Sequence, residues 1–432
     1  MRYLLIAALT VILTLPARAE VKIQEVTSPG GITAWLVEEP SIPFVALELR
    51  FQGGASLDAP GKRGATNLMI GLLEEGAGEL DSQGFARATE ALAARFGYDV
   101  GDDNASISAR FLTENRDEAL ELLRLSIIEP RFEEVAVNRV RQQVLAGIRS
   151  SQNDPNDIAS RAFDAATFGD HPYGSALQGT IDSVGALTRD DIVAAHKGVL
   201  TRDRLYVAAV GDITAAELGP MLDELLANLP ETGAALPDKV APMLDGSTSV
   251  VEFDTPQSVA LFGQVGMERD DDDFFAAYLL NTILGGGGFE SRLMEEVRVK
   301  RGLTYGVYSY LVPKDWAALY LGSVSSANDR IAEAVDVIRA EWSRMAAEGV
   351  TQEELDEAKA LLTGAYPLRF DGNGSIAQIM AGMQMQGLPI DYIATRNDKV
   401  NAVSLEDINR VASEFLNPDE LTFVVVGKPD GV

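Results

Sequence analysis

The sequence predicts an α+β fold built from two homologous domains, and three observations lead to this prediction. Strand-like runs come before helix-like runs in each half of the chain, which is the order of α+β proteins rather than of a regular βαβ winding. A segment near the middle of the chain is repeated near its end. A proline-rich stretch separates the two halves. The length of 432 residues also exceeds what one hydrophobic core usually organises.

Residues 1–19 are predicted to be a secretory signal peptide. They combine a basic residue near the start, an apolar run over residues 3–15 and a small-x-small ending, so cleavage is expected before Glu20. The apolar run is short for a membrane span. The predicted location is therefore the periplasm, with the external medium as the alternative.

The composition excludes several classes of function. The chain has no cysteine, which rules out disulfides, thiolate metal ligands and cysteine nucleophiles. Its net charge of −29 argues against nucleic-acid binding, which needs a basic surface. Such a charge could attract cationic peptides or simply keep a secreted protein in solution, and the second reading is favoured. His171 and His196 are the only histidines, and they are too far apart to share one helical turn.

The first half contains strands, then a helix, then a further strand followed by several helices. Alternating or branched apolar residues predict strands at 32–39, 44–52, 105–113 and 204–211, and apolar spacing predicts helices at about 62–76, 84–97, through 115–168 and at 188–200. Residues 229–247 contain three prolines and no periodicity. They are predicted to link a domain at 20–228 to a second domain at 248–432.

The second half repeats this order. Strands are predicted at 248–254, 258–266, 303–312 and 316–326, with a helix from about 272, a glycine loop at 285–288, a helix at 289–300 and long helices from 327. Residues 186–212 also align without gaps to residues 402–428, at a fixed offset of 216 positions. Asp191 falls on Asp407, and Gly211 on Gly427. This offset implies duplication of a domain of about 200 residues, and two such halves could face each other across a cavity.

Several motifs, in the same order, carry a resemblance to a known family. They are GGASLDAPGKRG (53–64), FGDHPYGSALQGTIDSV (168–184), the strand end VGD (210–212) and LGGGGFESRLMEEVRVKRGLTYGVYS (284–309). The chain resembles the pitrilysin-like M16 zinc peptidases, in their small bacterial two-domain form. The resemblance implies two α/β-sandwich domains of the LuxS/metallohydrolase type that form half of a clamshell.

The resemblance also shows what this chain lacks. Catalytic members carry His-x-x-Glu-His on the first helix and a glutamate about 76 residues further on, which together hold zinc and activate its water. Aligned on the family's flanking glycines, the two histidine positions fall on Asn67 and Gly71, the base on Ile70 and the third ligand near Gly147. None of these residues can serve, so no metal or other cofactor is expected in this chain.

The same helix can be aligned with the motif in a second register. It places Glu74 on the base position and Glu75 on the second histidine, but Gly71 then replaces the first histidine and the anchors at Gly64 and Gly76 are lost. Zinc prefers neutral nitrogen ligands, which neither register offers. Glu74 and Glu75 are therefore predicted to be solvated residues in the last helical turn before Gly76.

In the family, an arginine and a tyrosine opposite the zinc reach the substrate carbonyl. Arg298 and Tyr305 stand at that spacing here, with six residues between them. The resemblance implies that they stabilise the negative charge of a tetrahedral intermediate. The alternative is a surface charge on a helix and a tyrosine packed on one face of a strand.

The remaining features carry less functional information. His171 is predicted to lie in a loop, and His196 to have a surface or packing role. The glycines at 285–288 lack the Lys-Ser/Thr of a phosphate-binding loop and suggest a flexible loop or hinge instead.

Together these inferences predict the non-catalytic, substrate-binding subunit of a heterodimeric zinc peptidase acting on peptides or unfolded polypeptides. A homologous subunit would hold the zinc, and this chain would supply Arg298 and Tyr305. A non-enzymatic peptide-binding or scaffold protein is the alternative, and an independent peptidase with unfamiliar ligands is the third hypothesis.

Overall fold

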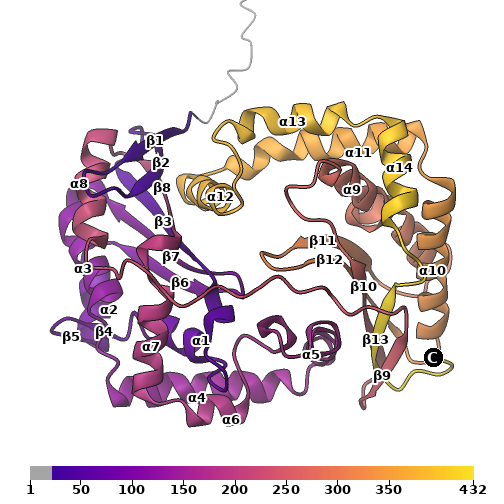
Figure 1. Cartoon of the computed structure of the whole chain (residues 1–432), viewed down its shortest axis with the longest axis horizontal. Helices are drawn as coiled ribbons and strands as arrows, with labels where there is room; N and C mark the ends of the chain where they lie inside the picture. The colour runs from indigo at the N-terminus through magenta and orange to yellow at the C-terminus, as the bar shows by residue number, and fades with distance from the viewer. Residues whose placement is uncertain (1–21) are drawn as a thin grey trace, which may run out of the picture.

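The computed structural model describes residues 22–432 and contains two α/β domains, each built on one mixed sheet (Figure 1). The predicted signal peptide at 1–19 lies outside these residues. Among residues 22–432, no helix is both long enough and apolar enough to cross a membrane.

The first domain has a six-stranded sheet in the order β1-β2-β8-β3-β7-β6. Its strands are β1 (Gln24–Thr27), β2 (Thr33–Glu38), β3 (Phe44–Gln52), β6 (Arg95–Val100), β7 (Asn104–Leu112) and β8 (Leu205–Gly211). Its helices are α1 (Ala65–Ile70), α2 (Ser82–Ala91), α3 (Arg116–Ile128), α4 (Glu134–Ser151), α5 (Pro155–Phe168), α6 (Ile181–Ala186), α7 (Arg189–Val199) and α8 (Ala215–Leu226). A short ribbon, β4 (Gly76–Ala77) with β5 (Leu80–Asp81), completes it.

The second domain has a five-stranded sheet in the order β11-β12-β10-β13-β9. Its strands are β9 (Thr248–Glu252), β10 (Gln257–Val265), β11 (Val307–Pro313), β12 (Ala318–Ala327) and β13 (Thr422–Gly427). Its helices are α9 (Phe274–Asn281), α10 (Ile331–Glu348), α11 (Gln352–Ala365), α12 (Asn373–Met385), α13 (Tyr392–Ala402) and α14 (Leu405–Phe415), with π-helical turns η5 (Thr282–Gly286) and η7 (Met294–Val299) and the 3₁₀ turn η8 (Tyr366–Phe370). No helix or strand lies between α8 and β9.

The two sheets share one topology. The strand that closes each domain is parallel to one neighbour and antiparallel to the other: β8 pairs with β2 and β3, and β13 pairs with β9 and β10. The first sheet adds only β1 at one edge. The prediction of an α+β chain with two homologous domains is therefore confirmed.

The duplicated segment keeps its local structure. α7 and α14 each begin with a capping box, made by Thr188 and Asp191 in the first domain and by Ser404 and Asp407 in the second. The strands that follow end at glycines with positive φ, 140° and 153°. A Cβ at the first of these, Gly211, would lie 2.2 Å from the Phe44 carbonyl oxygen, so only glycine fits.

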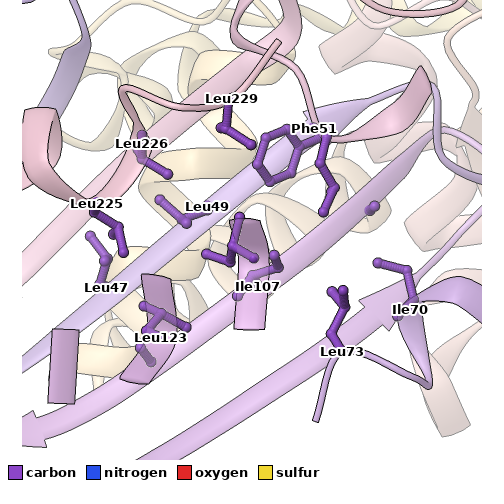
Figure 2. Close-up of a cluster of buried hydrophobic side chains, with 14 of the residues drawn as sticks. Leu47, Leu49, Phe51, Ile70, Leu73, Ile107, Leu123, Leu225, Leu226 and Leu229 are labelled. Atoms are coloured by element: carbon purple, nitrogen blue, oxygen red, sulfur yellow. The ribbon is translucent and has the colours of Figure 1, made fainter. Parts of the chain in front are cut away.

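Side chains of β3 alternate between two different apolar layers. Val45, Leu47, Leu49 and Phe51 are essentially fully buried in the core of the first domain, together with side chains from β7, α3 and α8 (Figure 2). On the opposite face of the strand, Phe44 and Ala46 pack in a separate cluster with α12 of the second domain.

Each domain contributes one helix that packs on the sheet of the other domain, an arrangement called here the exchange of α5 and α12. α12 of the second domain packs on β3 and β8 of the first sheet, and α5 of the first domain packs on β10 and β13 of the second sheet (Figure 1). Phe163 of α5 is fully buried in the cluster that contains Leu261 and Val424. Each sheet therefore depends on the other domain to cover part of one face.

Several element boundaries differ from the prediction. The helix predicted at about 62–76 spans only Ala65–Ile70, and residues 71–74 form turns. The helix predicted at 84–97 ends at Ala91, because β6 begins at Arg95 and pairs with β7. The helix predicted at 289–300 is a π-helical turn over Met294–Val299.

Candidate functional site

α1 is the helix onto which the sequence resemblance places the metal motif, and its start is determined by backbone geometry. Gly64 precedes the helix with φ of 96°, and a Cβ there would lie 2.5 Å from the Gln178 carbonyl oxygen. The buried carboxylate of Asp58 accepts hydrogen bonds from the backbone N–H of Gly64 (2.7 Å) and Thr66 (2.8 Å). Burial raises the pKa of Asp58, and these hydrogen bonds oppose that rise.

The positions onto which the resemblance places the metal motif lie on two faces of this helix. Asn67 and Gly71, one turn apart, are on its half-exposed face, whereas Ile70 is only 3% exposed and belongs to the core of the first domain. A carboxylate at position 70 would be buried among apolar side chains, where an unpaired charge is costly. Neither Asn67 nor Gly71 offers the imidazole that zinc binds in the family.

The third ligand position falls on α4. Gly147 is exposed there and has no side chain to offer. α4 passes beside α1, and Val140 of α4 belongs to the same apolar core as Ile70 of α1. Within residues 22–432, no group of three histidine, aspartate or glutamate side chains is arranged to hold a metal ion.

The two glutamates after α1 differ in their surroundings. Glu74 is exposed, as predicted, and partial burial together with the charge of Glu75 raises its pKa. The prediction that Glu75 is a solvated residue is wrong, since Arg139 donates to both of its carboxylate oxygens and Ser82 donates to one. Burial opposes the ionised form of Glu75, but these hydrogen bonds leave its pKa below the ordinary value. Gly76, with φ of 116°, begins β4 rather than ending a helix.

Both histidines have structural contacts. The Nε2 atom of His196 lies 2.7 Å from the Ile127 carbonyl oxygen, and burial lowers the pKa of this imidazole. The ring of His171 packs edge-on against Tyr173, whose backbone N–H donates to its Nδ1 at 3.2 Å.

Arg298 and Tyr305 lie in the second domain near the glycine-rich segment. Arg298 is on η7, with its guanidinium carbon 4.6 Å from the ring centre of Phe289. Tyr305 comes two residues before β11 and is 85% exposed. The alternative in which this tyrosine packs on one face of a strand is therefore wrong.

The glycine-rich segment is more ordered than a simple loop. Gly285 and Gly286 belong to the π-helical turn η5, and a Cβ at Gly285 would lie 2.3 Å from Ser309 Oγ of β11. Gly288, with φ of 66°, has open space around its Cα. π-helical turns inside helices often mark functional sites, and η5 and η7 bracket Phe289 beneath Arg298.

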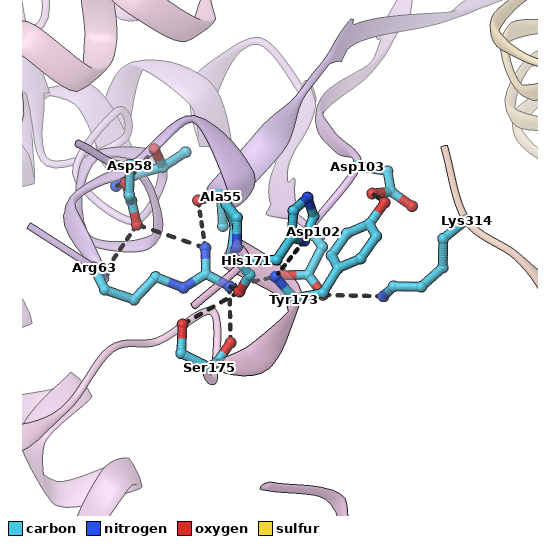
Figure 3. Close-up of polar contacts among 12 residues, drawn as sticks. Ala55, Asp58, Arg63, Asp102, Asp103, His171, Tyr173, Ser175 and Lys314 are labelled. Carbon is cyan, nitrogen blue, oxygen red and sulfur yellow. Dashed lines mark hydrogen bonds and ion pairs between the residues drawn. The ribbon is translucent and has the colours of Figure 1, made fainter. Parts of the chain in front are cut away.

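A polar junction joins the two domains (Figure 3). Arg63 donates to Asp102 Oδ1 at 2.8 Å, and Lys314, from the β11–β12 turn of the second domain, donates to Asp102 Oδ2 at 3.2 Å. Tyr173 donates its hydroxyl to Asp103 and accepts from the backbone N–H of Trp316 at 3.2 Å. Sequence reasoning missed this junction, because its members are separated by up to about 250 residues and follow no motif.

Comparison with known proteins gives consistent results along the chain. Residues 34–181 match the family profile described as Insulinase (Peptidase family M16), and residues 186–362 match the one described as Peptidase M16 inactive domain. The non-peptidase homolog YmxG of Helicobacter pylori is 29% identical over 393 residues, which cover 90% of each chain. An uncharacterized zinc protease of Streptomyces coelicolor is 25% identical, over 91% of this chain and 87% of its own.

Solved structures agree with this assignment. A peptidase M16 inactive domain from Pseudomonas fluorescens superposes with a TM-score of 0.88 at 29% identity, covering 94% of this chain and 98% of the other. A protease from Helicobacter pylori has the same fold, with a TM-score of 0.85 at 20% identity over 94% and 99% of the two chains. The chain belongs to peptidase family M16.

Proposed function

We propose that this chain is the non-catalytic, substrate-binding subunit of a heterodimeric zinc peptidase that acts on peptides or unfolded polypeptides. The zinc would be held by a homologous partner subunit, and this chain would bind no cofactor itself. Arg298 and Tyr305 would reach the partner's site. The periplasmic location indicated by residues 1–19 is part of the same proposal.

The observation that carries this proposal is the unpaired state of Arg298. Its neighbours Lys300 and Arg301 both form ion pairs with Glu296, at 2.6 Å each. Within residues 22–432, Arg298 has no carboxylate within 4.0 Å, and its side chain donates no hydrogen bond to the protein. Its charge is thus available to a ligand, and the exposed hydroxyl of Tyr305 is available as well.

These two groups suit a reaction that develops negative charge. Attack on a peptide carbonyl converts its oxygen into an oxyanion, which N–H and O–H donors stabilise more strongly than they stabilise the neutral carbonyl. Zinc in a partner would polarise the carbonyl and activate water. The ring of Phe289, itself 68% exposed, lies against the guanidinium of Arg298 and favours this position of the charge.

The test is reconstitution with a zinc-bearing M16 homologue. The single chain should bind no stoichiometric zinc and cleave no peptide, and activity should appear on mixing. Arg298→Ala or Tyr305→Phe should then lower kcat by about 10²–10³, the usual effect of losing one oxyanion donor, with a much smaller change in KM.

Matched controls are available beside each residue. Arg301→Ala removes a neighbouring charge that is already paired with Glu296, and Tyr308→Phe removes a half-exposed hydroxyl on β11. Both should leave kcat unchanged. If the Arg298 and Tyr305 variants behave like these controls, the chain has only a scaffold or peptide-binding role. Zinc-dependent cleavage by the single chain would contradict the whole proposal.

A further inference from the structure

A cavity of about 710 Å³ lies between the two domains, and neither α1 nor Arg298 nor Tyr305 is part of its lining. Its wall is formed by the end of β3 and by α9, β11, η8, α12 and α13. Four arginines line it, Arg50, Arg269, Arg369 and Arg396, together with five aromatic rings, those of Phe274, Phe275, Tyr278, Tyr366 and Tyr392. No aspartate or glutamate is part of this wall.

The charge of this lining is opposite in sign to the net charge of the chain. The protein has 65 acidic and 36 basic residues, so a cavity lined by four arginines and no carboxylate is not expected from the composition. Only Arg50 has a carboxylate nearby, that of Glu48 at 3.2 Å. Within the described residues, the other three guanidinium groups have no carboxylate within 4.0 Å, although acidic residues are abundant elsewhere on the chain.

In the described part of the chain, the positive charge of Arg396 is buried without a counter-ion. This residue is 4% exposed, and its Nη1 donates to the Leu362 carbonyl and to Asn397 Oδ1, both at 2.9 Å. These acceptors are neutral, and no residue in 22–432 accepts from its Nε or Nη2. A buried cation without a counter-ion is unfavourable, so an anion in the cavity would stabilise it.

Two more arginines are held in fixed positions. The guanidinium of Arg269 lies 4.2 Å from the ring centre of Phe274 and donates to the hydroxyl of Tyr392. Arg50 lies against α12 at Gly382, where a Cβ would come within 2.9 Å of its Nη1. The cationic groups are thus positioned by rings and by close backbone approach before any ligand arrives, which lowers the entropic penalty of binding.

The chemistry of the wall defines the ligand. Guanidinium groups bind carboxylates and other oxyanions with paired N–H donors, and aromatic rings pack against apolar side chains. The cavity volume fits a ligand of many atoms, such as a short peptide, rather than a single small ion. We propose that this cavity binds an acidic peptide segment that carries aromatic or aliphatic side chains between its carboxylates. This assignment rests on the proposed peptide-binding function and names a feature of its substrate.

The overall charge of the protein does not prevent such binding. At an ionic strength of 0.15 M the field of distant charges is screened beyond about 8 Å, whereas contacts inside a partly buried cavity are screened much less. Local arginines therefore determine which peptide binds, and the negative surface mainly slows the approach of an acidic one.

The test is a binding measurement on the full chain alone. By calorimetry, the acetylated and amidated peptide Asp-Phe-Glu-Leu-Glu should bind at least about tenfold more tightly than the matched peptide Asn-Phe-Gln-Leu-Gln. Arg369→Gln and Arg269→Gln should each raise the Kd of the acidic peptide by about tenfold or more, as expected for loss of a charge-assisted hydrogen bond. Arg149→Gln, which removes an exposed charge from α4, should leave the affinity unchanged.

Several outcomes would overturn the assignment. Equal affinity for the two peptides, or unchanged affinity in both cavity variants, would show that the arginines do not select acidic peptides. If pyrophosphate or ATP displaces the bound peptide and binds with a lower Kd than the peptide, the cavity is assigned to a phosphate ligand instead. Arg369 is exposed, so its substitution tests the cavity without threatening the fold. No partner or zinc is present in this experiment, and its result is therefore independent of the reconstitution test.

Discussion

Single residues explain how α1 is built. Gly64 is required by its positive φ and by the Gln178 carbonyl, so the helix begins at Ala65. Ile70 contributes to the core of the first domain, whereas Asn67 and Gly71 are only half-buried and Gly147 is exposed. Of these four positions, only Ile70 has a packing role in the core.

Asp164 on α5 provides a prediction at the same scale. It lies near Lys314, Asp102 and Tyr310 at the domain junction, and burial, opposed by Lys314, raises its pKa to about 6. A carboxyl with a raised pKa binds its proton more tightly in the folded state than in the unfolded state, where the pKa is about 3.9. The free energy of unfolding should therefore fall as pH rises from about 4 to about 6 and stay reduced above that range.

Asp164→Asn should raise the free energy of unfolding at pH 7.5 by up to about 2 kcal/mol, because it removes a poorly solvated charge. At pH 4, where the native carboxyl is protonated, variant and parent should be nearly equal. Urea unfolding at both pH values measures this difference. Asp170→Asn, which removes a charge from an exposed turn, is the control. If Asp164→Asn raised the free energy of unfolding as much at pH 4 as at pH 7.5, the charge of Asp164 would not be the cause.

At the scale of elements, the duplicated helices α7 and α14 are the part of the fold that sequence reasoning described best. The helix at 188–200 and the strand after it were predicted closely because an amphipathic helix and an apolar strand are local signals, and the repeat extended both to residues 402–428. Their capping boxes were found only in the structure. The ends of α1 and α2 could not be predicted in this way. α2 ends early because the β6–β7 hairpin begins inside the segment predicted as helix. After Ile70, Leu72 and Leu73 belong to a core that includes side chains distant in sequence, such as Leu225.

The two capping boxes predict matched losses of stability. Thr188→Ala and Ser404→Ala each leave one backbone N–H at a helix start without its acceptor, so each should destabilise its own domain by about 0.5–2 kcal/mol. Calorimetry should show a lower Tm for both variants, and Thr188→Ser and Ser404→Thr should restore it because they keep the hydroxyl. A loss confined to one of the two helices would show that the repeats no longer contribute equally.

At the scale of the whole molecule, the exchange of α5 and α12 makes the two domains interdependent. α12 covers Phe44 and Ala46 of the first sheet, and α5 covers Leu261 and Val424 of the second. The same exchange places β3, β11 and α12 around the arginine-lined cavity. The position of the cavity is therefore a consequence of how the two halves pack.

Separation of the halves tests this interdependence. Residues 20–247 expressed alone would expose the apolar surface that α12 covers, including Trp35, Phe44 and Val210, and should self-associate. Size-exclusion chromatography measures this. In the control, the full chain is cut within 229–247 after folding, and its two pieces should still elute together. A monomeric, cooperatively melting fragment of residues 20–247 would contradict the argument.

The amino-acid sequence by itself determined the duplication and the two-domain α+β class, because these depend on residue types and local patterns. Only the tertiary structure decided that α1 ends at Ile70, that each domain covers the other's sheet and that Arg50, Arg269, Arg369 and Arg396 share one cavity. A local pattern shows that a helix has an apolar face, but not which sheet covers it. Four arginines spread over about 350 residues become one site only when the two domains pack together.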